Sequence, residues 1–282
     1  MSSPSSTVDT SAEANKNAPI KYVKPLPPRK IIFGLLGAAL FAGVLYLFAT
    51  GNLQWDKVWL WLFDYRILQG VLNTLIYSFA AMILGIAGGA LLAIASISTN
   101  RVWRYLAQGY IALFRALPLI ILLLILYNIA IFIPRVDLPG MSINVNSIVT
   151  PFAAAVLGLA LHEAAYMAEI IRAGINGVNK GQLQATESIG MTYTQSLRWV
   201  IVPQALRLIV PPTANQFISM LKNTSLVVVI AGNDLLTVAK GLYSNNFLTM
   251  ELLFVTAIWY LALVMIFTWV ASLLERRFSK GA

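Results

Sequence analysis

The segment LHEAAYMAEIIRAGINGVNKGQLQATESIGMTYTQSLRWVIVPQALRLIVPP, which runs from Leu161 to Pro212, decides how this chain is organised. Long apolar runs lie on both sides of it, whereas the segment itself mixes charged and polar residues with glycines and ends in prolines. Its polar part, from Arg172 to Pro211, is longer than a turn between two helices requires. We therefore expect this segment to contact a soluble partner.

The composition excludes several classes of protein. Of the 282 residues, 59% are hydrophobic and 11% charged, and the mean hydropathy is +0.75, whereas soluble domains carry about 25% charged residues. Cysteine is absent and His162 is the single histidine, which excludes disulfides, thiolate sites and the usual multi-histidine metal sites. We therefore expect a membrane protein without metal or cofactor. Its cationic residues are dispersed, which argues against nucleic acid as a partner.

The apolar runs predict the fold class. A membrane-spanning helix needs about 20 mostly apolar residues, and we predict an all-α integral membrane protein with six such spans. Residues 1–29 are predicted to form a disordered cytoplasmic tail that stays in the mature chain. The six predicted spans are Lys30–Thr50, Gln69–Ser98, Val102–Ile133, Ser147–Ile171, Pro212–Ala231 and Met250–Leu274.

The distribution of Lys and Arg predicts the orientation, because cytoplasmic loops are enriched in these residues. An even number of spans puts both termini on one side of the membrane. With that side inside, most of the twenty Lys and Arg residues are cytoplasmic, and the outer loops hold only Lys57, Arg66, Arg135 and Lys240. We therefore expect cytoplasmic termini and a cytoplasmic loop at 173–211.

Glycine and proline divide this loop into two predicted helices. Residues Gln182–Ile189 are mostly good helix formers and precede Gly190, which predicts a short helix that ends at a glycine cap. A second amphipathic piece, Thr192–Val202, is predicted to end at Pro203. The pattern leaves two alternatives open: a helix pair that docks into a groove of another protein, or one that lies at the lipid headgroups.

The loop resembles the EAA loop of the inner-membrane permease subunits of binding-protein-dependent ABC importers. The family pattern is EAA, three residues, Gly, nine residues, Ile, one residue and Leu-Pro. Gln184, Ala185 and Thr186 stand at the EAA positions, and Gly190 and Pro203 match at the full spacing. The first position departs from the pattern, because Gln184 lacks the acidic charge and cannot form a salt bridge that the family glutamate would make.

Three further segments are similar to the polar amino acid permeases of these importers, the branch that serves histidine, glutamine, glutamate, aspartate and arginine. They are Leu113–Tyr127, Ala164–Gln182 and Val202–Ile230, and the resemblance covers roughly residues 69–277. Members commonly have five spans, so Lys30–Thr50 looks like an added N-terminal helix.

The resemblance implies a type I ABC importer permease fold in a bacterial plasma (inner) membrane. It also implies the partners: a second permease subunit, identical or homologous, two ATP-binding subunits and an extracytoplasmic amino acid binding protein. The chain contains no GxxxxGK[ST] motif, so we expect ATP hydrolysis on a partner and no enzymatic activity here. An ion-coupled secondary transporter of small polar solutes stays open as the alternative, although no inverted repeat is visible.

Ionisable residues at bilayer depth predict a substrate path. In the fourth span, His162, Tyr166 and Glu169 fall on one helix face, and Glu163 lies one step around it. A carboxylate and an imidazole there are suited to the ammonium group or side chain of an amino acid. Two alternatives remain: Glu169 pairs with Arg172 near the cytoplasmic surface, and His162 is a packing residue.

Other spans supply the remaining path candidates. Lys222 lies in the fifth span, where it would bind a substrate carboxylate or pair with Glu163. Arg115 together with Pro118 predicts a kink or a gate in the third span. The complete set on these other spans is Asn73, Thr74, Arg115, Asn215, Ser219, Lys222 and Asn223.

Overall fold

The computed structural model describes residues 28–51, 53–139 and 141–279. It divides into two compact units, residues 1–53 and 54–282. The described part of the first unit contains one helix, α1 (Pro28–Thr50). Its stretch Ile32–Gly43 is apolar but shorter than a membrane span. The predicted span Lys30–Thr50 therefore coincides with a helix and stays a prediction as a span. The predicted tail at 1–29 lies almost wholly outside the described residues.

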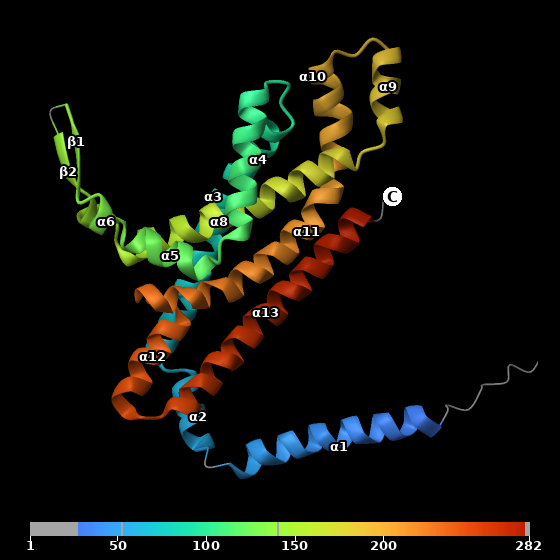
Figure 1. Ribbon diagram of the computed structural model, residues 1–282. Coiled ribbons are helices and arrows are strands. Elements are labelled where there is room, and N and C mark those ends of the chain that lie inside the picture. Colours follow the sequence, from blue (N-terminus) through green and yellow to red (C-terminus); the bar gives the residue numbers. More distant parts are fainter. Residues whose placement is uncertain (1–27, 52, 140, 280–282) are drawn as a thin grey trace, which may run out of the picture. The chain divides into compact units, whose positions relative to one another are not determined.

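The second unit is a helical bundle with one small hairpin among its described residues (Figure 1), which confirms the predicted all-α class. The hairpin strands pair antiparallel, with Arg135 opposite Asn144. In chain order the elements are α2 (Trp55–Leu62), α3 (Tyr65–Ser96), α4 (Arg101–Ala116), α5 (Leu119–Tyr127), α6 (Ile129–Phe132), β1 (Arg135–Leu138), β2 (Met141–Asn144), α7 (Val145–Ile148), α8 (Pro151–Asn176), α9 (Lys180–Ser188), α10 (Tyr193–Ser196), the π-helix η1 (Leu197–Ile201), α11 (Val202–Asn223), the 3₁₀-helix η2 (Thr224–Ile230), α12 (Leu235–Asn246) and α13 (Thr249–Ser279).

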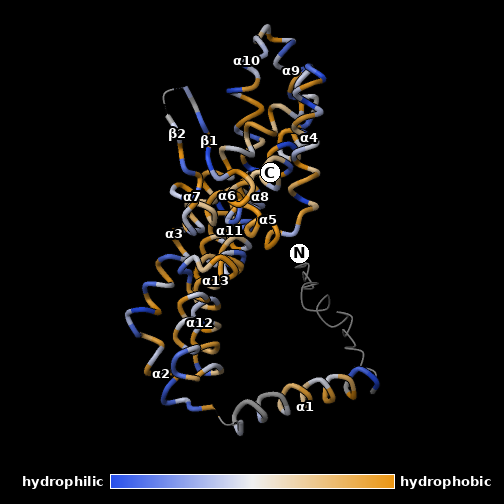
Figure 2. The backbone as a smooth tube through the Cα atoms, turned by 60° about the vertical axis from the view of Figure 1, so that its left-hand side comes forward, coloured by the Kyte–Doolittle hydropathy of each residue, from blue (hydrophilic) through white to orange (hydrophobic). Residues whose placement is uncertain are grey.

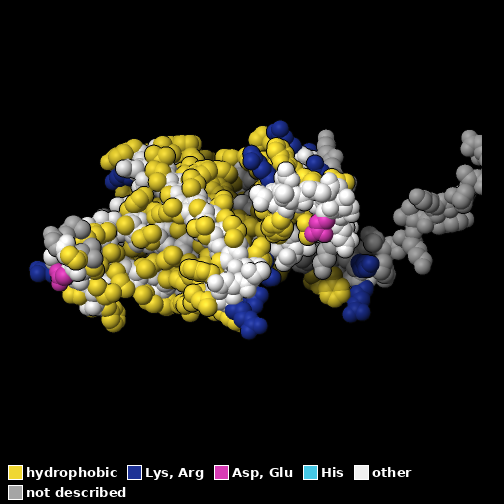
Figure 3. All heavy atoms as spheres, turned by 90° about the horizontal axis from the view of Figure 1, so that it is seen from above, with side chains coloured by type: hydrophobic (Ala, Val, Ile, Leu, Met, Phe, Trp, Pro, Cys, Tyr) yellow, Lys and Arg dark blue, Asp and Glu magenta, His cyan; other side chains and the backbone are white. Residues whose placement is uncertain are grey.

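Three helices of the described residues, α3, α8 and α13, are long and apolar enough to cross a membrane. Two pairs of helical segments pass the same test only together, because each is bent: α4 with α5 by 102°, and the run Tyr193–Ile230 with α12 by 45°. If each bent pair is one span, this unit has up to five, the number that the sequence resemblance implies. Hydrophobic side chains accordingly cover much of the face seen in Figure 3.

The predicted third span, Val102–Ile133, is bent within the helical region, at the place where the kink was predicted. Proline has no N–H to donate and forces the residue before it out of the helical region. Leu117, which precedes Pro118, is extended, with φ −75° and ψ 126°. The helix therefore ends at Ala116 and a new one begins at Leu119, so the kink that was predicted at Arg115 and Pro118 is a sharp corner.

The central helix α8 packs against α3, α4, α5 and α11. Glycine permits its close approach to α3: a Cβ atom on Gly89 would lie 2.5 Å from Cβ of Met167 and 2.9 Å from the backbone nitrogen of Ala168. Where α5 crosses α8, the buried side chains of Leu123 and Leu159 belong to the main apolar core. Small residues thus set the helix spacing, as they do in many membrane helix pairs.

The two ends of the unit differ. Helices α9 and α10 lie at one end and α2 and α12 at the opposite end, and the C-terminus of α13 points toward the α9–α10 end (Figure 1). Figure 2 shows mostly hydrophobic residues along α3 and α13 and mostly hydrophilic ones in α9. The polar loop is therefore a separate cap on one end of an apolar bundle.

Candidate functional site

The α9–α10 segment has a well-defined corner at Gly190. Helix α9 ends in a glycine cap: the N–H of Gly190 donates to the carbonyl of Glu187 and the N–H of Met191 to that of Thr186, both at 3.0 Å. This pair of bonds is the Schellman arrangement and needs a left-handed residue, and Gly190 has φ +76°. Thr192 then caps α10 in a capping box with Gln195. The predicted glycine cap is confirmed.

A small apolar core holds this segment to the bundle. Val178, Ile201 and Ala205 are buried together, with Leu183 of α9 and Ile209 of α11 packed against them. Because α9 contributes to the same cluster as the end of α8 and the start of α11, a displacement of α9 must move these two helix ends. The segment is thus packed against the bundle through these side chains.

The expected helix end at Pro203 is wrong. The helical run continues from Tyr193 through η1 into α11, and Pro203 occupies the first turn of α11. A proline ring clashes with the carbonyl four residues earlier in an ordinary α-helix. The π turn accommodates it, because the N–H of Val202 donates to the carbonyl of Leu197, five residues back. Pro203 therefore marks a change of helix type and not an end.

The residues at the EAA positions divide between surface and interior. Gln184 and Ala185 are exposed, whereas Thr186 is 4% exposed and its hydroxyl donates to the carbonyl of Leu183 at 2.7 Å. Three large side chains that the sequence pattern did not single out, Ile189, Tyr193 and Trp199, are exposed on the same polar segment. Exposed apolar side chains in a polar setting are typical of a contact surface for another protein.

Glu163 lies inside the subunit and not on a surface. It is 0% exposed, and its Oε2 accepts a hydrogen bond from Nε2 of Gln216 on α11 at 3.2 Å. Its Oε1 is buried without a hydrogen-bond partner among the described residues. The predicted pairing with Lys222 is wrong, since Lys222 is exposed and has no ion-pair partner there. In this conformation Glu163 joins α8 to α11.

The other ionisable residues of α8 do share a face, and they meet α4. The rings of His162 and Tyr166 are 4.9 Å apart, and the Arg115 guanidinium lies 5.5 Å from the centre of the Tyr166 ring. Glu169 accepts hydrogen bonds from Arg172, and its Oε2 is 4.0 Å from Nη1 of Arg115. The alternative that Glu169 pairs with Arg172 is thus confirmed, within a larger cluster that includes the helix corner.

Helix α11 carries a row of polar side chains that reaches the surface of this unit. Lys222 and Asn215 are exposed, and Ser219 and Asn223 are partly exposed. Asn215 donates from Nδ2 to Oε1 of Glu275 on α13 at 3.3 Å. The predicted common face is therefore observed, and its members lie outside the core that contains Glu163.

Asn73 and Thr74 hold the turn that enters α12. Nδ2 of Asn73 donates to the carbonyl of Asn233 at 2.9 Å, and the Thr74 hydroxyl accepts from the N–H of Leu235 at 3.1 Å. Thr74 is fully buried. Tyr77, one turn further along α3, donates to the carbonyl of Gly232. The two predicted path residues thus both bond to this turn, and the sequence pattern missed Tyr77.

A polar pocket of about 430 Å³ lies beside this turn, at the end opposite α9. Arg66 at its rim is held by Asp64, whose carboxylate accepts from both Nε and Nη2 of the guanidinium. The arginine lowers the pKa of Asp64 below its usual value. The lining includes Arg66, Gln69, Asn73, Asn233, Gly241 and Asn245.

Comparison with known proteins identifies the family. The model for the binding-protein-dependent transport system inner membrane component matches residues 81–280. The arginine transport system permease protein ArgU of Corynebacterium glutamicum is 36% identical over 92% of this chain and 83% of its own length. The putative glutamine transport system permease protein GlnP of Rickettsia typhi is 33% identical over 75% and 92%.

Solved structures agree with this assignment. A crystal structure of an amino acid ABC transporter with histidines superposes with a TM-score of 0.67 at 35% identity, covering 75% of this chain and 94% of the other. The MetNI methionine ABC transporter, at 18% identity and a TM-score of 0.56, shares the fold. This chain belongs to the family of binding-protein-dependent transport system inner membrane components, the permease subunits of ABC importers.

Proposed function

We propose that this chain, together with a second permease subunit, forms the path for a polar amino acid of the glutamate, glutamine, aspartate, arginine or histidine type. ATP hydrolysis on two partner subunits would drive import, and an extracytoplasmic binding protein would deliver the substrate. The observation that carries the proposal is the α9–α10 segment with its exposed apolar side chains, packed against the ends of α8 and α11. The roles named for the relatives support the substrate class.

Coupling would pass through the small core beneath α9. When the ATPase closes on Ile189, Tyr193 and the exposed residues Gln184 and Ala185, it displaces α9. Leu183 transmits that displacement to the ends of α8 and α11, which are themselves in close contact. Rotation of packed helices as rigid bodies is a common way to convert a local displacement into a change of access.

The exposed polar row on α11 is the part of the path that we assign to this subunit. A lysine that faces lipid is unfavourable, so we propose that the second permease subunit covers this face. Lys222 would then bind the substrate carboxylate, and Ser219 and Asn223 offer hydrogen bonds to its polar groups. A second polar site on the path, which would bind the ammonium group, would be the cluster of Arg115, His162, Tyr166 and Glu169.

Three further predicted residues would hold the helices of this path in position without contacting the substrate. Glu163 would fix the distance between α8 and α11 through Gln216, and Asn73 and Thr74 would fix the turn into α12. A change at these positions should alter the rate of transport more than its substrate preference.

We also propose that the α9–α10 end is cytoplasmic. Arg172, Arg198, Arg276 and Arg277 belong to elements that begin or end at this side of the unit, and excess positive charge is typical of the cytoplasmic side. The C-terminus would then be cytoplasmic, in a bacterial inner membrane.

Reconstitution tests the proposal. We would place the permease with its ATPase in proteoliposomes, add the binding protein with a panel of radiolabelled amino acids, and measure uptake and ATP hydrolysis. We expect uptake that requires ATP, and hydrolysis that rises with loaded binding protein. Uptake that follows an ion gradient without ATP would instead establish the secondary transporter.

A further inference from the structure

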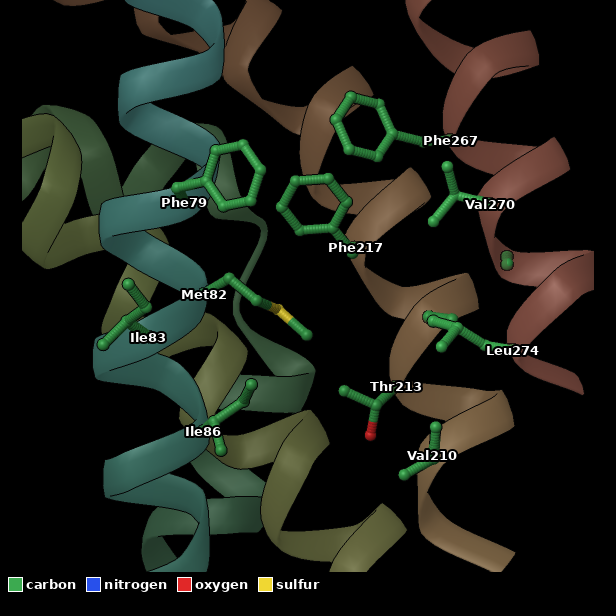
Figure 4. A pocket seen from close by; sticks show the side chains of 12 residues that line it. Phe79, Met82, Ile83, Ile86, Val210, Thr213, Phe217, Phe267, Val270 and Leu274 are labelled. Carbon is green, nitrogen blue, oxygen red and sulfur yellow. The ribbon is translucent and has the colours of Figure 1, made fainter. Parts of the chain in front are cut away.

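An apolar groove lies open at the surface between α3, α11 and α13 (Figure 4). Its volume is about 300 Å³, near the lower end of the range for small-molecule sites. Thr213 carries the one hydroxyl group in the lining, and that hydroxyl donates to the carbonyl of Ile209 at 2.8 Å. A polar solute therefore finds no free donor in the groove. The lining includes Ile83 and Ile86 from α3, Val210 and Phe217 from α11, and Val270 and Leu274 from α13.

Aromatic rings gather at one end of the groove. The ring of Phe217 is 4.8 Å from that of Phe79 and 4.9 Å from that of Phe267, so one ring from each helix meets there. Figure 4 shows these three rings together, with Ile86 and Val210 at the other end of the groove. The groove thus has an aromatic end and, opposite it, the end at Ile86 and Val210, which we call the open end.

The open end leads to positive charge. On α13, Val270 and Leu274 face the groove, and Arg277 follows at the next step of the same helix face. Arg276 and Arg277 are exposed, and neither has an ion-pair partner among the described residues. The acidic residue next to them, Glu275, accepts a hydrogen bond from Asn215. Two adjacent cations therefore follow the groove lining along α13.

We infer that this groove holds one acyl chain of an anionic phospholipid, with the terminal methyl toward the phenylalanine rings and the phosphate against Arg276 and Arg277. An acyl chain matches a lining without free donors, and clustered arginines next to a membrane attract anionic headgroups. The site is separate from the coupling segment and from the polar row of α11 that ends at Lys222. The lipid would belong to the leaflet at the α9–α10 end, which the proposed orientation makes cytoplasmic.

The absence of cysteine from the chain allows a direct test. We would introduce Val270→Cys into the full-length chain, attach a fluorophore, and assemble the permease in nanodiscs. Phosphatidylglycerol with brominated acyl chains would be compared with phosphatidylcholine that carries the same chains. The matched control is Trp269→Cys, which lies at the same depth on α13 but outside the groove lining.

We expect brominated phosphatidylglycerol to quench the label at position 270 at about 25-fold lower mole fraction than phosphatidylcholine, about fivefold for each of the two arginines near the membrane surface. The label at position 269 should show no preference. Replacing both arginines in Arg276→Gln/Arg277→Gln should remove the preference, and Arg101→Gln/Arg104→Gln, which removes two charges from the start of α4, should leave it.

Two results would overturn the inference. Equal quenching by both lipids at position 270 would make the groove an ordinary lipid-facing surface. Protection of position 270 from both lipids, with a disulfide between two copies of the Val270→Cys chain, would make the groove an interface between subunits. Transport activity enters neither readout, so a failure of the proposed function and a failure of this inference remain distinguishable.

Discussion

A Cβ atom on Gly85 of α3 would lie 2.6 Å from Cγ of Glu163 on α8 and 2.8 Å from its Cβ. Beyond this contact, the carboxyl group of Glu163 accepts a hydrogen bond from Gln216 on α11. Three helices thus meet around one buried side chain. A residue that the sequence pattern assigns to the substrate path is, in this conformation, a brace between helices.

Gly85→Ala should lower the stability of the bundle. The added methyl group meets Cβ and Cγ of Glu163, which cannot move without shifting α8, and overpacking of this kind costs about 1–3 kcal/mol. The measurement is the thermal unfolding temperature of the purified permease. Gly109→Ala on α4 is the control, because nothing lies within 4 Å of its Cβ position, and alanine favours the helix there. Equal unfolding temperatures of both variants and the parent would contradict the close contact.

Glu163→Ala and Lys222→Gln should affect transport differently. Glu163→Ala leaves Gln216 without its acceptor, which costs about 1–3 kcal/mol, so the unfolding temperature should fall while the order of substrate preference stays the same. Lys222→Gln removes an exposed charge and should leave stability unchanged. If Lys222 binds the substrate carboxylate, its loss should raise the transport Km about tenfold, the effect of one charge-assisted hydrogen bond. A changed substrate preference in Glu163→Ala would show that Glu163 contacts the substrate.

Substitutions at Gly190 should follow backbone conformation and not side-chain size. Its φ of +76° costs an ordinary L-residue about 1–2 kcal/mol, and asparagine tolerates this region better than most. Gly190→Val should therefore lose the stimulation of ATP hydrolysis by loaded binding protein, and Gly190→Asn should keep most of it. There is open space around the Cβ position, so the two variants differ mainly in backbone preference. Full stimulation in Gly190→Val would show that the corner is not required.

Thr74→Val should loosen the turn that enters α12. The substitution removes the acceptor of the Leu235 N–H bond, and a buried donor without a partner costs about 1–3 kcal/mol. Hydrogen–deuterium exchange of the peptide that contains Leu235 should become faster. Ser78→Ala is the control, because the Ser78 hydroxyl bonds only to a carbonyl of its own helix. Unchanged exchange in Thr74→Val would mean that Asn73 and Tyr77 hold the turn without it.

The sequence predicted the features that depend on composition and on local chemistry. Apolar runs indicated the helical membrane class, and the spacing of Gly190 and Pro203 indicated the polar segment that we propose to couple to the ATPase. The cap at Gly190 was predictable because a left-handed residue after a helix is a local requirement. The shared face of His162, Tyr166 and Glu169 follows in the same way from helix periodicity.

Features that depend on neighbouring helices were not predictable. A helix face is known from the sequence, but the helix that covers it is not. Glu163 therefore faced Gln216 and not Lys222, and the apolar residues of α3, α11 and α13 formed a groove that no single helix reveals. Pro203 lies within a helical run because the π turn before it leaves room for the proline ring. Ile201 of that turn packs in the small core with Val178 and Ala205. The sequence by itself determined the class, the long apolar helices α3, α8 and α13, and the corner at Gly190. The tertiary structure decided which polar groups are buried and which reach a surface, because that choice depends on which helices pack together. Glu163, for example, is buried where α8 lies against Gly85 of α3.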